Sequence, residues 1–251
     1  MLIPSFEEYI KDRAIDNATA EIINNLNQGA AEFSFINDTL YILSKNKMSN
    51  IYKIYRNQIS QVEIGETSQP ILNGARLFAA NQNGDIYLYG YPDRESILFK
   101  KASDSNELKN VLEYNGIIDI VAEGNKVYLL TKDKLLIRSN TDAMKKIIDF
   151  SLDGKEFLAF NVAAINNNNF ISFAVPENDN ILTYRESMDN GVFSLKFYNH
   201  YGANCTCKTP HQGWFNAPTS IVANSDESIV YVLDNYNNRL VTKINDKSNH
   251  R

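Results

Sequence analysis

The stretch that decides the fold is residues 213–244, which read GWFNAPTSIVANSDESIVYVLDNYNNRLVTKI. A pair of apolar runs lies within residues 218–234, and a third run follows at 240–244. Clusters of Asn, Asp and Ser separate these runs. Short runs rich in Val, Ile, Leu and Tyr between turn-forming residues are typical of β-strands joined by tight turns. The stretch therefore predicts three consecutive strands.

The same rhythm occurs in four earlier units of the chain. In each unit, a pair of apolar runs is followed by a third and a fourth run. The pairs span residues 31–43, 75–89, 117–130 and 160–175. The third runs are 51–55, 97–101, 135–138 and 181–185, and the fourth runs are 59–64, 108–112, 146–150 and 193–197. Four strands repeated at a spacing of roughly 42 residues are the sequence signature of β-propeller blades.

A lone four-stranded sheet cannot cover both of its apolar faces, so such sheets stack in a ring. An all-β sandwich is the alternative, but it does not account for five recurrences of the same pattern of Asn, turn and aromatic residue. We therefore expect an all-β fold, a β-propeller of five or six four-stranded blades. The fifth unit lacks a fourth run before the chain ends, so another segment or another chain is a candidate to complete the ring.

The last repeat resembles an NHL repeat, over about residues 201–244. That family has a Gly-x-Phe-Asn-x-Pro lead-in, a strand ending in Asp, and an Asn and an Arg that open the next strand. The matching residues are Gly213, Phe215, Asn216, Pro218, Tyr231, Asp234, Asn238 and Arg239. The resemblance implies an NHL-type propeller, in which Asp234 and Arg239 are structural and not catalytic. The earlier repeats are degenerate, since they keep the strand rhythm without these residues.

Residues 1–28 follow a different pattern from the rest. Ser5 and Glu8 form a capping box, in which the two side chains satisfy backbone groups at a helix start. Apolar residues then recur every three to four positions, and Gly29 supplies a stop. We expect a short helical N-terminal arm at 1–28 and the propeller at 29–251.

Four side chains that can bind a metal lie close together in the sequence: His200, Cys205, Cys207 and His211. Thiolate and imidazole are the preferred ligands of Zn²⁺, and two of each can complete a tetrahedral site. They fall in an apparent insertion between the fourth and fifth units, where a metal would staple a loop that has no core of its own. The alternative is an ordinary surface loop with two free thiols, because one residue between two cysteine ligands is an unusually tight spacing.

Charge and hydropathy exclude some classes of function. The net charge of −5 argues against nucleic acid as a partner, since a nucleic-acid binder normally carries a basic face. No apolar run is long enough for membrane insertion. The first residues lack the basic start and apolar run of a secretory signal, which favours the cytoplasm or a virus particle. A mature chain whose signal has been removed would look the same.

Three functions fit this pattern. The first is a non-enzymatic propeller with protein partners, acting as an interaction scaffold or a structural component of a larger assembly. The second is a structural protein of a virus particle or phage tail. The third is a propeller enzyme of the lactonase, hydrolase or lyase type with a metal in the central channel, whose candidate ligands near strand ends are Asn81, Glu123, Asn166, Asn224 and Asp234. Tight turns require the same residue types, so these positions also have a structural interpretation.

Overall fold

The structure is a computed structural model, and it describes a defined part of the chain. The described residues are 30–36, 39–45, 49–55, 58–90, 96–139, 148–151, 157–165, 168–175, 179–189, 192–201, 215, 218–223, 229–234 and 239–244. The predicted helical arm at 1–28 lies outside them.

The described residues form five antiparallel sheets. Four of them have four strands each. The first sheet contains β1 (Ala30–Ile36), β2 (Thr39–Ser44), β3 (Asn50–Tyr55) and β4 (Gln58–Gln61), and the second contains β5 (Ala75–Ala80), β6 (Ile86–Gly90), β7 (Ile97–Lys101) and β8 (Leu108–Glu113). The third contains β9 (Asp119–Glu123), β10 (Lys126–Leu130), β11 (Lys134–Ser139) and β12 (Ile148–Ser151), and the fourth contains β13 (Ala159–Ile165), β14 (Asn168–Val175), β15 (Asn180–Asp189) and β16 (Val192–Tyr201). The fifth sheet has three: β17 (Pro218–Ala223), β18 (Ile229–Asp234) and β19 (Arg239–Ile244).

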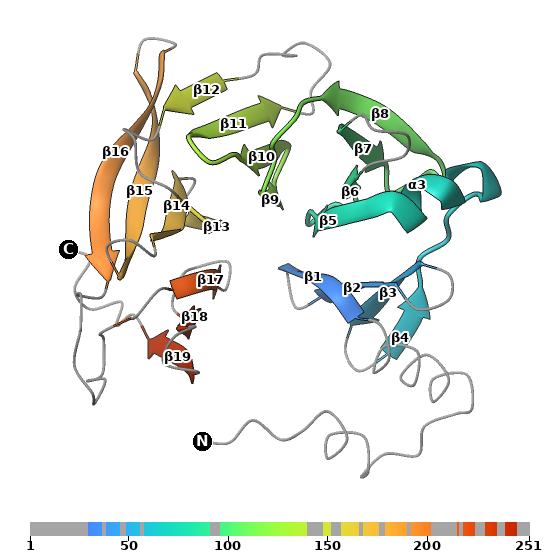
Figure 1. Cartoon of the computed structure of the whole chain (residues 1–251), viewed down its shortest axis with the longest axis horizontal. Helices are drawn as coiled ribbons and strands as arrows, with labels where there is room; N and C mark the ends of the chain where they lie inside the picture. Colours follow the sequence, from blue (N-terminus) through green and yellow to red (C-terminus); the bar gives the residue numbers. More distant parts are fainter. Residues whose placement is uncertain are drawn as a thin grey trace.

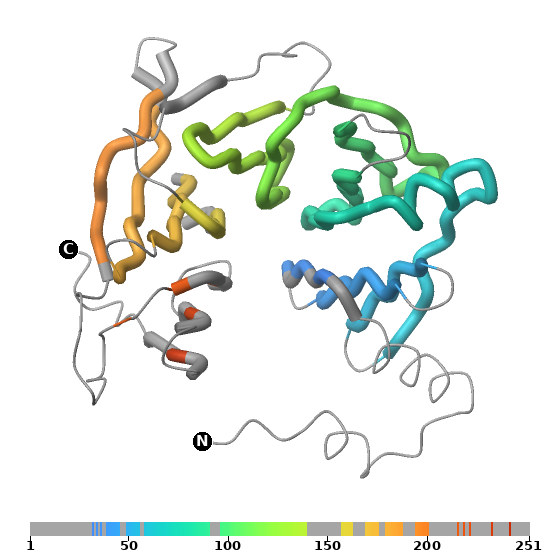
Figure 2. The backbone as a smooth tube through the Cα atoms, in the orientation of Figure 1, coloured from blue at the N-terminus to red at the C-terminus, as the bar shows by residue number. Residues whose placement is uncertain are grey.

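The five sheets surround a common centre, as the blades of a propeller do (Figure 1). In each sheet the strands pair in sequence order, with the first strand innermost. Neighbouring first strands are in contact, β1 with β5, β5 with β9, β9 with β13 and β13 with β17. The chain passes once around the centre, from β1 in blue to β19 in red (Figure 1), and the backbone tube follows the same course (Figure 2). The predicted propeller-like arrangement is thus confirmed at the level of the sheets.

Each pair of consecutive sheets encloses its own apolar core. Along β10, Val127 and Leu129 belong to the cluster shared with the second sheet, whereas Tyr128 and Leu130 belong to the cluster shared with the fourth. This division follows from the strand geometry, because successive side chains point to opposite faces. A middle strand is therefore buried on both faces, which explains why its sequence is a nearly continuous apolar run.

The predicted strands match the observed ones closely. All five pairs of runs and all five third runs are strands, and so are the four fourth runs. The main differences are in length, because β15 and β16 each extend to ten residues. The fifth sheet has three strands in the described part of the chain, as its sequence predicted.

A short helix lies between the first two sheets, where the sequence analysis predicted no regular element. A 3₁₀ turn at Glu66–Ser68 leads into α3 (Gln69–Gly74), which has Pro70 in its first turn, a position that proline tolerates in a helix. Leu72 packs into the core between the first and second sheets. Gly90 of β6 allows the C-terminal end of the helix to lie close to β6, because a Cβ atom at position 90 would lie 2.5 Å from the carbonyl oxygen of Gly74. None of the helices in the described ranges is long and apolar enough to span a membrane.

Candidate functional site

His200 is the described member of the predicted zinc cluster. It lies on β16, where its Cα pairs with that of Leu182, so it belongs to a strand and not to the predicted loop. Its exposed ring stacks on that of Phe197 at a centroid distance of 6.4 Å. Cys205, Cys207 and His211 lie outside the described residues. Within the described ranges, no group of three or more His, Cys, Asp or Glu side chains could hold a metal ion.

Five residues of the NHL-like motif lie within the described part of the chain. Phe215 is 3% exposed and packs with residues of the fourth and fifth sheets. In the fifth sheet Asp234 pairs through its Cα with Pro218 on one side and with Arg239 on the other. Three motif positions are therefore neighbours at one end of this sheet. Tyr231 lies on β18. Gly213, Asn216 and Asn238 lie outside the described residues.

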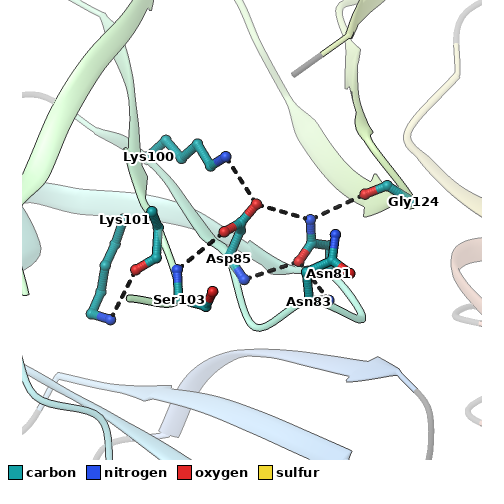
Figure 3. Close-up of polar contacts among 8 residues, drawn as sticks. Asn81, Asn83, Asp85, Lys100, Lys101, Ser103 and Gly124 are labelled. Carbon is teal, nitrogen blue, oxygen red and sulfur yellow. Dashed lines mark hydrogen bonds and ion pairs between the residues drawn. The ribbon is translucent and has the colours of Figure 1, made fainter. Parts of the chain in front are cut away.

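Asn81, proposed above as a channel ligand, organises the turn between β5 and β6 (Figure 3). Its Oδ1 accepts the backbone N–H groups of Asn83 at 3.0 Å and Asp85 at 2.9 Å. Its Nδ2 donates to Asp85 Oδ2 at 3.3 Å and to the carbonyl oxygen of Gly124, in the next sheet, at 3.1 Å. Both the Oδ1 and the Nδ2 atoms of Asn81 are hydrogen-bonded to protein atoms, and the bond to Gly124 links the second sheet to the third.

Asp85 extends the same cluster (Figure 3). Its Oδ1 accepts the backbone N–H of Ser103 at 3.1 Å, and its Oδ2 forms an ion pair with Lys100 at 2.9 Å. Gly84, with φ of +81°, supplies the left-handed residue of the turn, a conformation that glycine adopts without steric cost. The sequence Asn-Gln-Asn-Gly-Asp at 81–85 carries the signal for such a turn, because Asn and Asp side chains bond to backbone groups two to four residues away.

Sequence reasoning missed a second polar cluster, between the third and fourth sheets. Glu186 of β15 accepts hydrogen bonds from Lys126, from the hydroxyl of Tyr128 at 3.2 Å, and from Asn169. Asn169 also donates to the Tyr128 hydroxyl at 2.8 Å. Burial, reinforced by the charge of Glu186, raises the pKa of Tyr128. Lys126 and Tyr128 of β10 are at least 41 positions from Asn169 and Glu186, which is why no local motif marks the cluster.

Two carboxyl groups lie at the beginning of innermost strands. Asp119 opens β9, and burial raises the pKa of its carboxyl to about 7, although backbone hydrogen bonds from Phe160 and Ile120 oppose the rise. The charge of Glu32, on β1, contributes to this high pKa. Burial also raises the pKa of Glu32, against the attraction of Lys45. Both of these carboxyl groups therefore lie on innermost strands, and burial is the main cause of each shift.

The other candidate channel ligands have different positions. Glu123 ends β9, one residue before the glycine that Asn81 contacts, and burial raises the pKa of its carboxyl. Glu123 and Asn81 are thus brought together, at the opposite end of β9 from Asp119. Asp234 is in the fifth sheet, and Asn166 and Asn224 lie outside the described residues.

The outer strand of the fourth sheet presents exposed aromatic side chains. Phe197 is 59% exposed and Tyr198 is 41% exposed. The rings of Phe197 and Tyr184 meet in a T-shaped arrangement with their centroids 5.9 Å apart. On the opposite face, the rings of Tyr198 and Phe170 do the same at a centroid distance of 4.8 Å. Each face of this outer edge thus carries one exposed aromatic side chain.

Comparison with known proteins supports the fold alone. No family model matches the chain, and no curated protein does. Among solved structures, an auxiliary nutrient binding protein from Bacteroides ovatus matches with a TM-score of 0.52 at 14% identity, over 85% of this chain and 59% of that one. YCF48 from Cyanidioschyzon merolae matches with a TM-score of 0.48 at 9% identity, over 81% of this chain and 64% of that one.

The chain therefore spans about three fifths of the length of these two structures. Both are propeller-like. At such low identity, the likeness to the Bacteroides ovatus protein establishes a shared propeller-like fold and no shared activity.

Proposed function

We propose that the chain is a five-bladed β-propeller of the NHL kind that binds protein partners without catalysing a reaction, as a scaffold or a structural component of a larger assembly. The observation that carries this proposal is the outer strand β16, with Phe197 and Tyr198 exposed along a sheet edge. Such a surface is costly to leave in water and is stabilised when a partner covers it.

Closure of the ring by five blades is part of this proposal. In the described part of the chain, contacts between first strands run from β1 through β5, β9 and β13 to β17. A closed ring of five requires that the fifth sheet meet the face of the first sheet that carries Ile42 and Tyr52, which pack together with Leu40 and Ile54 of the same sheet.

The use of the polar side chains favours a scaffold over an enzyme. Ser34 of β1 bonds to both the N–H and the carbonyl of Ala80 in β5. Asn81 joins the second sheet to the third, and Asp119 joins the third to the fourth. These innermost polar groups thus connect neighbouring sheets and make the body rigid, as a platform for partners requires.

The test is isolation of the full-length protein from its native source after mild chemical cross-linking. We expect a discrete complex of fixed stoichiometry, with cross-links concentrated on the fourth sheet. An enzyme would behave differently: the chain would stay monomeric after cross-linking, and it would hydrolyse members of a panel of lactones and esters in a way that chelation abolishes. That pair of results would overturn the proposal.

A further inference from the structure

Two pairs of innermost strands are joined by the same kind of hydrogen bond. Ser34 of β1 accepts the backbone N–H of Ala80 in β5 at 3.1 Å. Asp119 of β9 accepts the backbone N–H of Phe160 in β13 at 3.0 Å. Because β5 and β13 have a strand on one side only in their own sheets, an amide on the other side takes its acceptor from the preceding sheet. One acceptor is a hydroxyl and the other a carboxyl, and of the two only the carboxyl ionises near neutral pH.

Burial is the main cause of the unusual titration of this carboxyl. It raises the pKa of Asp119 to about 7, and the N–H groups of Phe160 and Ile120 oppose the rise. The charge of Glu32, on β1, raises the pKa of Asp119 further, although β5 separates β1 from β9 around the ring. The carboxyls of the first and third sheets therefore influence one another, and ionisation of one disfavours ionisation of the other.

Few other charged groups lie on the elements packed against β9. β13 contains none, and β5 contains only Arg76. β10 contains only Lys126, which lies at the other end of β9 and forms an ion pair with the fourth sheet. Lys45, directly after β2, attracts the carboxylate of Glu32. The turn after β10, next to the start of β9, carries Lys132, Asp133 and Lys134. The charged side chain that raises the pKa of Asp119 is Glu32.

The contact between the third and fourth sheets is held differently at its two ends. At the start of β9, the hydrogen bond from Phe160 to Asp119 connects the sheets. Beyond the other end of β9, Lys126 and Tyr128 of β10 bond to Glu186 of the fourth sheet. A change in the protonation of Asp119 therefore acts on one end of this contact.

An opening that exposes Asp119 to water is linked to its ionisation. In the closed state the pKa of its carboxyl is about 7, whereas the ordinary value is 3.8. A group that binds its proton more tightly in the closed state opposes opening at low pH and favours it as pH rises toward the closed-state pKa. Between about pH 5 and about pH 7, the equilibrium constant for this opening should rise at least about tenfold, and above about pH 7 it should level off.

We propose that Asp119 is a pH-sensitive switch between β9 and β13. With its proton bound, the carboxyl keeps the third and fourth sheets joined at this end, and loss of the proton as pH rises toward neutrality favours local opening there. Glu32 adjusts the pH at which this happens, because its charge favours the protonated form of Asp119. The switch is a property of the fold and does not depend on the partners proposed above.

The test uses the full-length protein and amide hydrogen exchange followed by NMR, corrected for the intrinsic pH dependence of exchange. Protection of the Phe160 amide should fall at least about tenfold between about pH 5 and about pH 7. Protection of the Ala80 amide should change less, because its acceptor Ser34 does not ionise in this range. Leu129, fully buried in the middle strand β10, reports global unfolding, and its amide should exchange at least about tenfold more slowly than that of Phe160.

Two charge-removing variants locate the switch. Asp119→Asn should abolish the pH dependence of Phe160 protection, because an amide does not ionise here. Glu32→Gln should lower the pH midpoint of this dependence by about 0.3 or more, which is a twofold or greater loss of proton affinity. Glu113→Gln, exposed on the outer strand of the second sheet, is the matched control and should leave the midpoint unchanged, since solvent and salt screen its charge. Circular dichroism and thermal unfolding establish that each variant is folded.

Protection of Phe160 that does not change with pH in the wild-type protein would overturn the inference. Exchange of Phe160 at the rate of Leu129 at every pH would do the same, because the opening would then be global. Wild-type pH dependence in Asp119→Asn would assign the effect to another group and also reject the switch. If Asp119→Asn does not fold, Glu32→Gln decides, and an unchanged midpoint in that variant counts against the proposal.

Discussion

The carboxylate of Asp119 accepts a hydrogen bond from the backbone N–H of Phe160 at 3.0 Å, so the start of β9 is joined to β13 in the next sheet. Its other oxygen accepts the N–H of Ile120 at 2.9 Å. Even so, burial raises the pKa of this carboxyl to about 7. The group therefore holds two sheets together and is close to half ionised at neutral pH.

This pKa predicts how stability depends on pH. The pKa in the folded state lies above the ordinary value of 3.8, so the folded protein binds the proton more tightly than the unfolded chain does. The contribution of Asp119 is therefore fully present below pH 3.8, is lost as pH rises toward about 7, and is constant above that. The expected loss is on the order of 2–4 kcal/mol.

Asp119→Asn should remove this dependence. Urea unfolding at several pH values between 4 and 8 measures it, and the slope in this window should flatten, whereas Asp104→Asn, at an exposed position, should retain the wild-type slope. An unchanged slope in Asp119→Asn would show that other groups dominate the pH dependence.

The hydrogen bonds of Asn81 predict a large effect of a single truncation. The Asn81 side chain is fully buried. Asn81→Ala removes the hydrogen-bond partner of the N–H groups of Asn83 and Asp85 and of the carbonyl of Gly124. We expect the free energy of unfolding to fall by about 2–4 kcal/mol. Asn83→Ala, in the same turn but exposed, is the control and should cost about 0.5 kcal/mol or less.

Asn81→Asp separates the two roles of the amide. The variant keeps the acceptor but replaces the donor with an oxygen facing Asp85 and the carbonyl of Gly124. It should be at least as destabilised as Asn81→Ala at pH 7, because two carboxylates would then be adjacent. Equal stability of wild type and Asn81→Asp in urea would mean that the donor side of Asn81 contributes nothing.

Most of the fold could be predicted from the sequence, because its determinants are local. Runs such as Ile-Tyr-Leu-Tyr at 86–89 are apolar on both faces of a strand, and turn residues such as those at 81–85 separate them. Repetition of this pattern implies stacked sheets. The helix at Gln69–Gly74 was not predicted, since its six residues are too few to show a helical period and it depends on packing through Leu72.

The candidate sites were harder to predict, because their contacts connect different sheets. The partners of Glu186 on β10 lie about 60 positions away in the sequence, and nothing near Glu186 indicates which cation it meets. His200 shows a related difficulty: it was predicted in the insertion between the fourth and fifth units, but it continues the strand pattern of β16. Exposure of Phe197 depends on its place in the outermost strand, which only the assembled sheet defines.

The Lys126–Glu186 ion pair should contribute measurably to the contact between the third and fourth sheets. Their side chains are 33% and 9% exposed, so water screens the pair only in part. A double-mutant cycle with Lys126→Met and Glu186→Gln, followed by urea unfolding, should give a coupling energy of about 1–2 kcal/mol. A coupling below about 0.3 kcal/mol, typical of an exposed pair, would contradict this assignment.

The zinc site remains a prediction from the sequence, and its test is independent of the fold. If His200, Cys205, Cys207 and His211 form it, the purified protein should contain about one equivalent of zinc, with Zn–S distances near 2.3 Å and Zn–N distances near 2.0–2.1 Å by X-ray absorption. Cys205→Ser and Cys207→Ser should each release the metal. His250, outside the cluster, gives the control: His250→Ala should retain full metal content.

Removal of this metal should act locally, because each sheet has its own core with its neighbours and does not depend on a single loop. Chelation should therefore leave the urea midpoint almost unchanged while it increases protease cleavage between residues 200 and 216. The position of His200 adds a further check, since its ring stacks on Phe197 and metal binding would have to fix both rings. We expect chelation to change the imidazole NMR signals of His200. Protein with less than about 0.1 equivalent of zinc, and with His200 signals unaffected by chelator, would reduce the four residues to a coincidence of composition.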